Sequence, residues 1–177
     1  MSQAIYQIDS AHTSAQFSVR HMMIANVRGE FTKVNGTIAF DAADPANSRI
    51  EVSVEVASIN TREAQRDAHL RSADFFDVEN YPLLTFRGKK AVAHDDGAKV
   101  TGDITIRGIT REITLDVEGP APEAKDPWGN LRIGGTATAK LNRKDFGLTW
   151  NAALEAGGVL VGDEVKITID VEAVRQN

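Results

Sequence analysis

The sequence offers few residues whose types and spacing suit catalysis or metal binding. Asp67 and His69 are a neighbouring carboxylate and imidazole, the pair that general acid–base chemistry uses, but two positions apart on a helix they do not face each other. The four histidines, His12, His21, His69 and His94, show no metal-ligand spacing, and the chain has no Cys to supplement them. The sequence also lacks the phosphate-binding glycine loop and the zinc-protease motif. We therefore expect no metal and no cofactor.

His21 is the most informative single residue. It shares the strand parity of Phe17 and Val19, so the alternation of side chains along a strand points it inward with them. In a cavity it would orient the polar head of a ligand, whereas in a filled core it would be a histidine bonded to a backbone or side-chain partner. Met23 follows, and its thioether suits either an irregular apolar ligand or ordinary packing at the rim. Both interpretations stay open.

A second polar stripe falls in the one segment without strand alternation, residues 61–70. On a helix, Arg62, Arg66 and His69 stand at i, i+4 and i+7 and share a face. That face could bind an anionic head group such as a phosphate. A solvated charged surface is the more ordinary interpretation of such a stripe.

The elements that must position these residues are mainly strands. Strict alternation of apolar and polar residues predicts strands over 49–56, 100–107, 113–117 and 165–172. Further strands are expected over 5–8, 13–23, 27–34, 37–40, 84–93 and 131–141. The pair Asn35-Gly36 is a hairpin-turn signal, and the helix would begin at an N-cap formed by Asn60 or Thr61.

About nine short strands and one helical insertion indicate an all-β protein, either a sandwich or a closed barrel. Composition does not change along the chain, so we expect one domain over residues 1–177. Strands of roughly ten residues in sequential order favour an antiparallel up-and-down barrel, which leaves no exposed sheet edge. Both large and small residues fall on the inward phase, among them Phe31, Phe86 and Ala137. A filled barrel and a hollow one both fit this pattern.

The composition narrows the class of partner. The net charge of −5 and the pI near 5.4 argue against a broad grip on nucleic acid. No apolar run approaches the roughly 18 residues of a membrane-spanning helix. The first residues form neither a basic nor an apolar leader region, so we expect a cytoplasmic protein.

Short motifs along nearly the whole chain then point to a family. They are Asp9–Ser14, Phe17–Met23, Val27–Gly29, Phe40–Asp41, Asp44–Pro45, Ser58–Thr61, Arg66–Asp77, Tyr81–Pro82, Thr85–Phe86, Gly102–Asp103, Ile106–Thr110, Asn142–Gly147 and Val161–Val165. In these segments, and most strongly in Arg66–Asp77, the chain resembles the YceI-like family of lipocalin-like, polyisoprenoid-binding proteins.

The resemblance implies an elongated antiparallel barrel of eight strands with a helical cap and a long apolar pore. It implies that the pore holds the tail of an amphiphile, such as a polyisoprenoid, an isoprenoid quinone or a fatty-acid derivative. Family members are often homodimers, and many carry a secretion signal and act in the periplasm. The family has no agreed catalytic residues, so none is carried over.

The ligand-binding residues expected from parity and resemblance share inward positions on strands or places near a barrel end. They are Phe17, Val19, His21, Met23, Phe31, Phe75, Phe76, Phe86, Ala137 and Trp150. The candidates for contact with a head group are His21, Arg62, Arg66 and His69.

We therefore expect a non-enzymatic carrier or store for a long-chain lipid, because burial of each methylene contributes ~0.8 kcal/mol without precise polar contacts. Two alternatives remain. One is an enzyme that acts on a bound isoprenoid lipid through His21 or through Asp67 and His69. The other is a protein-interaction module whose cavity is incidental.

Overall fold

The computed structural model describes residues 3–41, 43–152, 154 and 160–176. In these ranges twelve β-strands form one sheet and a single α-helix, α1 (Ala64–Arg71), stands outside it. The strands are β1 (Ala4–Ile8), β2 (Ser14–His21), β3 (Ala25–Phe31), β4 (Val34–Phe40), β5 (Arg49–Glu55), β6 (Ile59–Asn60), β7 (Leu83–His94), β8 (Gly97–Ile106), β9 (Ile109–Glu118), β10 (Ala124–Lys125), β11 (Leu131–Asn142) and β12 (Val161–Gln176). Four short 3-10 turns interrupt them: η1 (Ser10–His12), η2 (Pro45–Asn47), η3 (Val56–Ser58) and η4 (Arg143–Phe146). Within the same ranges, we find no helix with the length and apolar character needed to cross a membrane.

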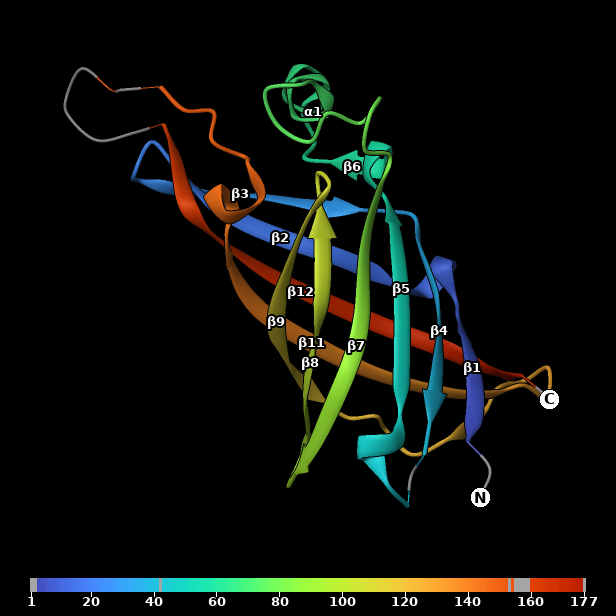
Figure 1. Ribbon diagram of the computed structural model, residues 1–177. Helices are drawn as coiled ribbons and strands as arrows, with labels where there is room; N and C mark the ends of the chain where they lie inside the picture. The colour runs from blue at the N-terminus through green and yellow to red at the C-terminus, as the bar shows by residue number, and fades with distance from the viewer. Residues whose placement is uncertain (1–2, 42, 153, 155–159, 177) are drawn as a thin grey trace.

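The strands join end to end into longer ones that close a barrel (Figure 1). β1 and β2, separated by η1, both pair with β12, while β4 pairs with β1 and β3 pairs with β2. In the same way β5 pairs with β4 and β6 with β3. Three composite strands result: β1 with β2, β3 with β4, and β5 with β6. Together with β7, β8, β9, β11 and β12 they give, in the described part of the chain, eight long antiparallel strands in sequential order, closed by the β11–β12 ladder. The predicted eight-stranded up-and-down barrel is confirmed.

Alternation of residue type explains which side of the wall faces inward. On β12, Ile167 and Ile169 face the interior while Lys166 and Asp170 are exposed. The same alternation on β5, β8 and β9 produces one dry face, as antiparallel sheet with a single buried side requires. The sheet therefore encloses an apolar interior along its whole length.

Large and small residues interlock at some places on this inner face. The ring of Phe86 packs over Gly102, where an added Cβ would lie 2.7 Å from the Phe86 Cζ atom. Phe17 likewise covers Gly29, and Phe86, Ile104 and Phe146 belong to the largest buried cluster. Part of the interior is thus filled like an ordinary core.

The Asn35-Gly36 pair does not form the predicted hairpin turn. Both residues lie inside β4, where Asn35 pairs with Ser53 and Gly36 with Val52. A Cβ at position 36 would clash with the carbonyl oxygen of Glu51, so glycine serves a close approach between strands. The composite strand instead breaks between Phe31 and Val34.

The helix starts later than the sequence predicts. Its N-cap is Glu63, whose carboxylate accepts a hydrogen bond from the Arg66 backbone N–H at 2.6 Å. Asn60 accepts from the N–H of Arg62 at 2.9 Å, in the turn that leads to the helix. Both predicted caps, Asn60 and Thr61, were therefore wrong, because the chain makes one more turn before α1 begins.

Candidate functional site

An apolar cavity of about 410 Å³ lies inside the barrel. Every long strand contributes to its wall, and most of the described residues that line it are aliphatic or aromatic. The polar residues that contribute to the described wall are Gln16, Arg20, His21, Ser48, Arg66, His69 and Arg143. A pocket with this lining suits a long apolar molecule with a small polar part.

Most of the polar lining residues gather at the end of the barrel that α1 covers (Figure 1). Arg20 and His21 end β2, Arg66 and His69 belong to α1, and Arg143 begins η4. The wall between the two ends is apolar. The cavity therefore has one end with cationic and imidazole groups and a long hydrocarbon-like remainder.

Three aromatic rings lie close together at the α1 end of the cavity. The imidazole of His69 meets Trp150 edge-on, with ring centroids 4.8 Å apart, and Phe75 at 5.1 Å. Phe75 and Trp150 are themselves 5.4 Å apart. His69 Nε2 also lies 2.8 Å from a carboxylate oxygen of Asp74, which orients the ring. All three rings line the cavity, so this aromatic cluster forms part of its wall beneath the helix.

Arg143 is a buried cation in the same wall, with 4% of its surface exposed. Its guanidinium donates to the backbone carbonyls of Gly162 at 2.8 Å, Trp150 at 2.9 Å and Val161 at 3.2 Å, and also to that of Leu148. The carboxylate of Asp163 is 3.8 Å away. Burial lowers the pKa of Arg143 from its usual value, but the group keeps its charge. We call these four backbone carbonyls the carbonyl cage. They accept hydrogen bonds from Arg143 without neutralising it, so a positive charge remains at this end of the cavity.

The structure places nearly all of the expected ligand-binding residues on the cavity wall. These are Phe17, Val19, His21, Phe31, Phe75, Phe76, Phe86, Ala137 and Trp150. Met23 lies outside the wall, because it occupies the exposed turn between β2 and β3 rather than the strand that was predicted there. Of the head-group candidates, His21, Arg66 and His69 line the cavity.

Arg62 does not join that group. It precedes α1 and is exposed, with its backbone in the left-handed region at φ 67°, so the predicted helical stripe of Arg62, Arg66 and His69 does not exist. Sequence reasoning also missed Arg20 and Arg143 as lining residues. Arg20 has the outward parity of its strand, and Arg143 sits in a turn whose burial no alternation predicts.

Asp67 has a structural partner. Its buried carboxylate accepts hydrogen bonds from the backbone N–H of Thr61, at 2.8 Å, and from the Thr61 hydroxyl. Arg66 Nε donates to the same hydroxyl at 2.8 Å. Because His69 pairs with Asp74 instead, the structure does not assemble Asp67 and His69 into an acid–base pair.

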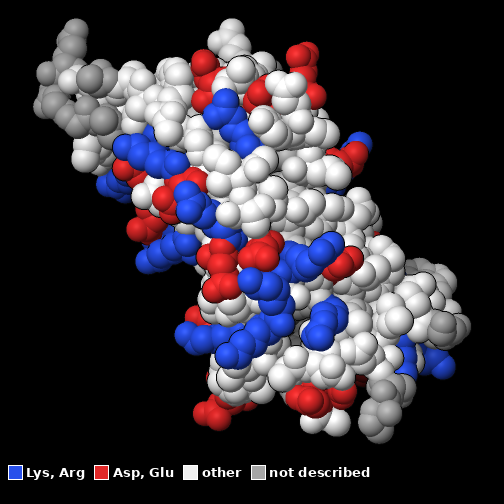
Figure 2. Space-filling view, in the orientation of Figure 1, with Lys and Arg blue, Asp and Glu red and all other residues white. Residues whose placement is uncertain are grey.

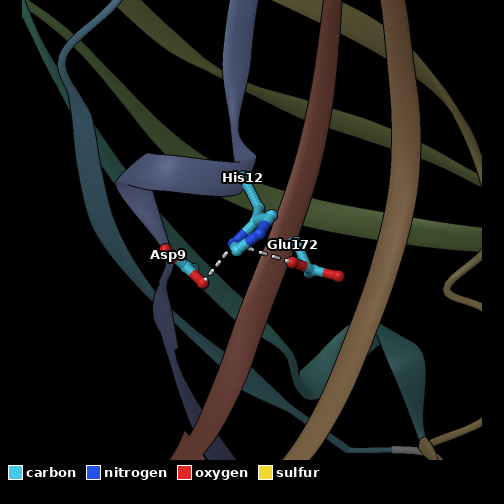
Figure 3. A group of neighbouring side chains, drawn as sticks. All are labelled: Asp9, His12 and Glu172. Carbon is cyan, nitrogen blue, oxygen red and sulfur yellow. Dashed lines mark hydrogen bonds and ion pairs between the residues drawn. The ribbon is translucent and has the colours of Figure 1, made fainter. Parts of the chain in front are cut away.

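A charged cluster outside the cavity joins Asp9, His12 and Glu172 (Figure 3). His12 Nδ1 lies 2.8 Å from Asp9 Oδ2 and 3.4 Å from Glu172 Oε2. The Arg132 guanidinium contacts the same two carboxylate oxygens, at 2.7 Å and 3.3 Å. Its hydrogen bond, followed by that of His12, lowers the pKa of Asp9 to about 2. A cation already satisfies these carboxylates, so the cluster is an ion-pair network rather than a metal centre.

The sequence comparisons agree with one another. A model of the YceI-like domain matches residues 6–173 of the chain. The UPF0312 protein SA2479 of Staphylococcus aureus strain N315 is 35% identical over 167 residues, which cover 94% of this chain and 95% of that protein. The UPF0312 protein SAB2563 of the bovine strain RF122 matches with the same identity and coverage.

Solved structures with the same fold agree with these sequence comparisons. The Campylobacter jejuni YCEI protein is 34% identical, with a TM-score of 0.74 over 89% of this chain and 90% of that one. Burkholderia cenocepacia BcnA gives a TM-score of 0.79 at 22% identity over 93% and 98% of the two chains. A polyisoprenoid binding domain from Saccharophagus degradans gives 0.70 at 13% identity over 97% and 98%. The last two show the fold alone, and together these findings confirm the resemblance read from the sequence.

Proposed function

Because the chain belongs to the YceI-like family, we propose that it binds a long-chain amphiphile such as a polyisoprenoid, an isoprenoid quinone or a fatty-acid derivative. The tail would fill the apolar cavity, and the protein would store or carry the molecule without reacting with it. One observation supports this most directly: every long strand contributes apolar residues to the wall while the charged lining residues gather at one end.

The arrangement of the wall also orients the ligand. The polar head would lie at the α1 end, near His21, Arg66 and the buried Arg143, and the tail would extend away from it. An anionic head such as a phosphate would gain most from the two guanidinium groups. Burial of each tail methylene contributes about 0.8 kcal/mol, so a long tail binds firmly with little discrimination between similar chains.

The titratable groups near the cavity favour binding over catalysis. Asp67 is bonded to Thr61 and His69 to Asp74, so the two residues do not act together as an acid–base pair toward the cavity. His21 is the other candidate for the enzyme alternative, and its half-buried position on the wall also suits a hydrogen bond to a head group. The Saccharophagus degradans domain, which has the same fold, is described as a polyisoprenoid binding domain, and this description supports the proposed class of ligand.

Organic extraction of the purified protein followed by mass spectrometry tests the proposal. We expect a long-chain amphiphile near one per chain, and uptake of added polyprenyl phosphate by delipidated protein. Empty extracts with no uptake would overturn the proposal and favour an interaction module. Turnover of the extracted lipid that His21→Gln abolishes, with binding intact, would establish the enzyme alternative instead.

The homodimer and the cytoplasmic location expected above remain predictions. Light scattering of the eluted protein gives the mass of the assembly, and fractionation of the producing cells gives its location. Transport between two sites would require that a ligand-loaded protein transfers its lipid to an acceptor vesicle.

A further inference from the structure

The turn between β2 and β3 has an unexpected sequence. The N–H of Ile24 donates to the carbonyl of His21 at 3.2 Å, which closes a tight turn around Met22 and Met23. These two residues have φ angles of 51° and 60°, both in the left-handed region, as in the type I′ turns that Asn-Gly ordinarily occupies. Two methionines at such positions cost conformational energy that Asn-Gly would not.

The same residues also expose apolar surface. Met22 is 42% exposed, Met23 is 56% exposed and Ile24 is 76% exposed. Burial in the core does not explain them, because all three point away from it. Both the turn geometry and the hydrophobic effect therefore disfavour these side chains on a solvated surface, and a contact with an apolar environment outside the described part of the chain would offset that cost.

The charge around the turn is positive. From Ala15 to Gly29 the sequence contains Arg20 and Arg28 and no acidic residue, in a chain of net charge −5. Both arginines are exposed, and Arg20 Nη2 donates to the carbonyl of Met23 at 3.2 Å, which holds the guanidinium directly beside the turn.

Neighbouring strands extend this charge. Cross-strand pairing places Lys140, Lys166, Ser18 and Arg28 in one row across β11, β12, β2 and β3. The acidic group paired with this row is Glu164, which lies 3.8 Å from the Lys140 ammonium. In Figure 2 the left flank of the molecule shows Lys and Arg side chains interspersed with Asp and Glu side chains.

The turn also stands at an end of the cavity. His21, the residue before it, lines the wall, and the N–H of Met22 donates at 2.8 Å to the carbonyl of Leu160, another lining residue. Whatever contacts the turn is therefore adjacent to the end of the cavity that carries the cationic groups.

We propose that the segment Met22–Ile24 is a membrane-docking tip that inserts its side chains into the headgroup region of an anionic lipid bilayer. Arg20 and Arg28 contact lipid phosphates there. Apolar side chains that enter the interface, with basic groups behind them, are the combination that holds proteins on anionic membranes. Entry of a lipid into the cavity while the protein is docked on a membrane rests on the proposed function, whereas the docking itself does not.

Sedimentation with vesicles tests the docking. We expect the delipidated protein to bind vesicles of phosphatidylcholine mixed with phosphatidylglycerol, and to bind phosphatidylcholine alone far more weakly. The double variant Met22→Asn, Met23→Gly fits the turn better, so it should fold with equal or greater stability and lose about tenfold in vesicle affinity. Val92→Thr, which removes an apolar side chain exposed elsewhere on β7, is the matched control and should bind as the parent does.

A second variant examines the charges. Arg20→Gln, Arg28→Gln should weaken binding to the anionic vesicles and flatten its dependence on salt. Absence of vesicle binding by the parent protein overturns the proposal, as does equal binding by the Asn-Gly variant; either result would leave a protein partner as the occupant of the tip. Uptake of polyprenyl phosphate from detergent is measured separately, so failure of the proposed function and failure of docking are distinguishable.

Discussion

The guanidinium of Arg132 on β11 and the carboxylate of Asp9, at the N-cap of η1, lie 2.7 Å apart. The same guanidinium contacts Asp126 at 2.8 Å and Glu172 on β12 at 3.3 Å. One cation thus joins the segment after β1 to the ladder that closes the barrel. The network stabilises the closure most when its carboxylates are ionised.

Acid should therefore weaken this closure in a defined range. The hydrogen bond to Arg132 lowers the pKa of both Asp9 and Asp126 to about 2, below their usual value of 3.8. A lowered folded-state pKa contributes stability that is complete above the unfolded value and lost as the pH falls toward 2. In Arg132→Met the two pKa values should return toward 3.8, so circular dichroism should show acid unfolding at a higher pH.

A matched control removes another surface cation. Lys89 contacts Asp103 at 3.1 Å and Glu112 at 2.8 Å, on the outside of the sheet. Lys89→Met should leave the acid midpoint close to that of the parent. An unchanged midpoint in Arg132→Met would show that the cluster does not contribute to acid stability.

Tryptophan fluorescence should report on the cavity. Trp150 lines it within the aromatic cluster, whereas Trp128 is 81% exposed. An apolar tail beside Trp150 removes water from the indole, so polyprenyl phosphate should shift the emission to shorter wavelength. The shift should persist in Trp128→Phe and disappear in Trp150→Phe. Persistence in Trp150→Phe would mean that the ligand binds elsewhere.

Strand periodicity predicted most of the barrel, because a sheet with one buried face must alternate residue types. It placed Phe17, Val19 and His21 on the inner side, where they line the cavity. Local turn signals predicted the structure less well than strand periodicity did. Asn35-Gly36 has turn chemistry but lies inside β4, since pairing with β5 overrides the local preference.

The parts that the sequence did not predict depend on tertiary contacts. The tight turn at Met22 and Met23 contradicts turn propensities, so no local rule finds it. The carbonyl cage of Arg143 gathers backbone atoms from Leu148 to Gly162, and nothing in the residue types of that segment indicates a guanidinium partner. Strand alternation cannot describe a wall built from turns.

Arg143 should be important for stability. Replacement by Met removes the guanidinium donors from the carbonyls of Leu148, Trp150 and Gly162, and each buried group left unsatisfied costs about 1–3 kcal/mol. We expect Arg143→Met to lower the free energy of urea unfolding by roughly 2–4 kcal/mol. Arg143→Lys should recover little of the loss, because an ammonium lacks the planar set of donors.

The neighbouring Lys144 provides the comparison for that experiment. Its ammonium is exposed and lies 3.4 Å from Asp163. Lys144→Met should change the free energy of unfolding by no more than about 0.5 kcal/mol. If both variants lost the same stability, the carbonyl cage would have no special role.

Ala137 distinguishes a hollow interior from a filled one. It lies on β11 opposite Ile169 of β12 and Val117 of β9, is 9% exposed and lines the cavity. In a filled core, Ala137→Leu would overpack and cost ~1–3 kcal/mol. Beside open space, the added methylenes gain burial, so the stability of the delipidated protein should hold or rise.

The same side chain would occupy the volume of the ligand. The affinity of Ala137→Leu for polyprenyl phosphate should therefore fall while its urea midpoint is maintained. Thr138→Leu adds similar bulk on the exposed outer face of the same strand and should leave the affinity unchanged. Both quantities are needed, denaturant unfolding of the delipidated protein and titration with the lipid. A destabilised Ala137→Leu variant that takes up lipid as the parent does would mean that Ala137 packs a solid wall, and that the tail lies in another part of the barrel.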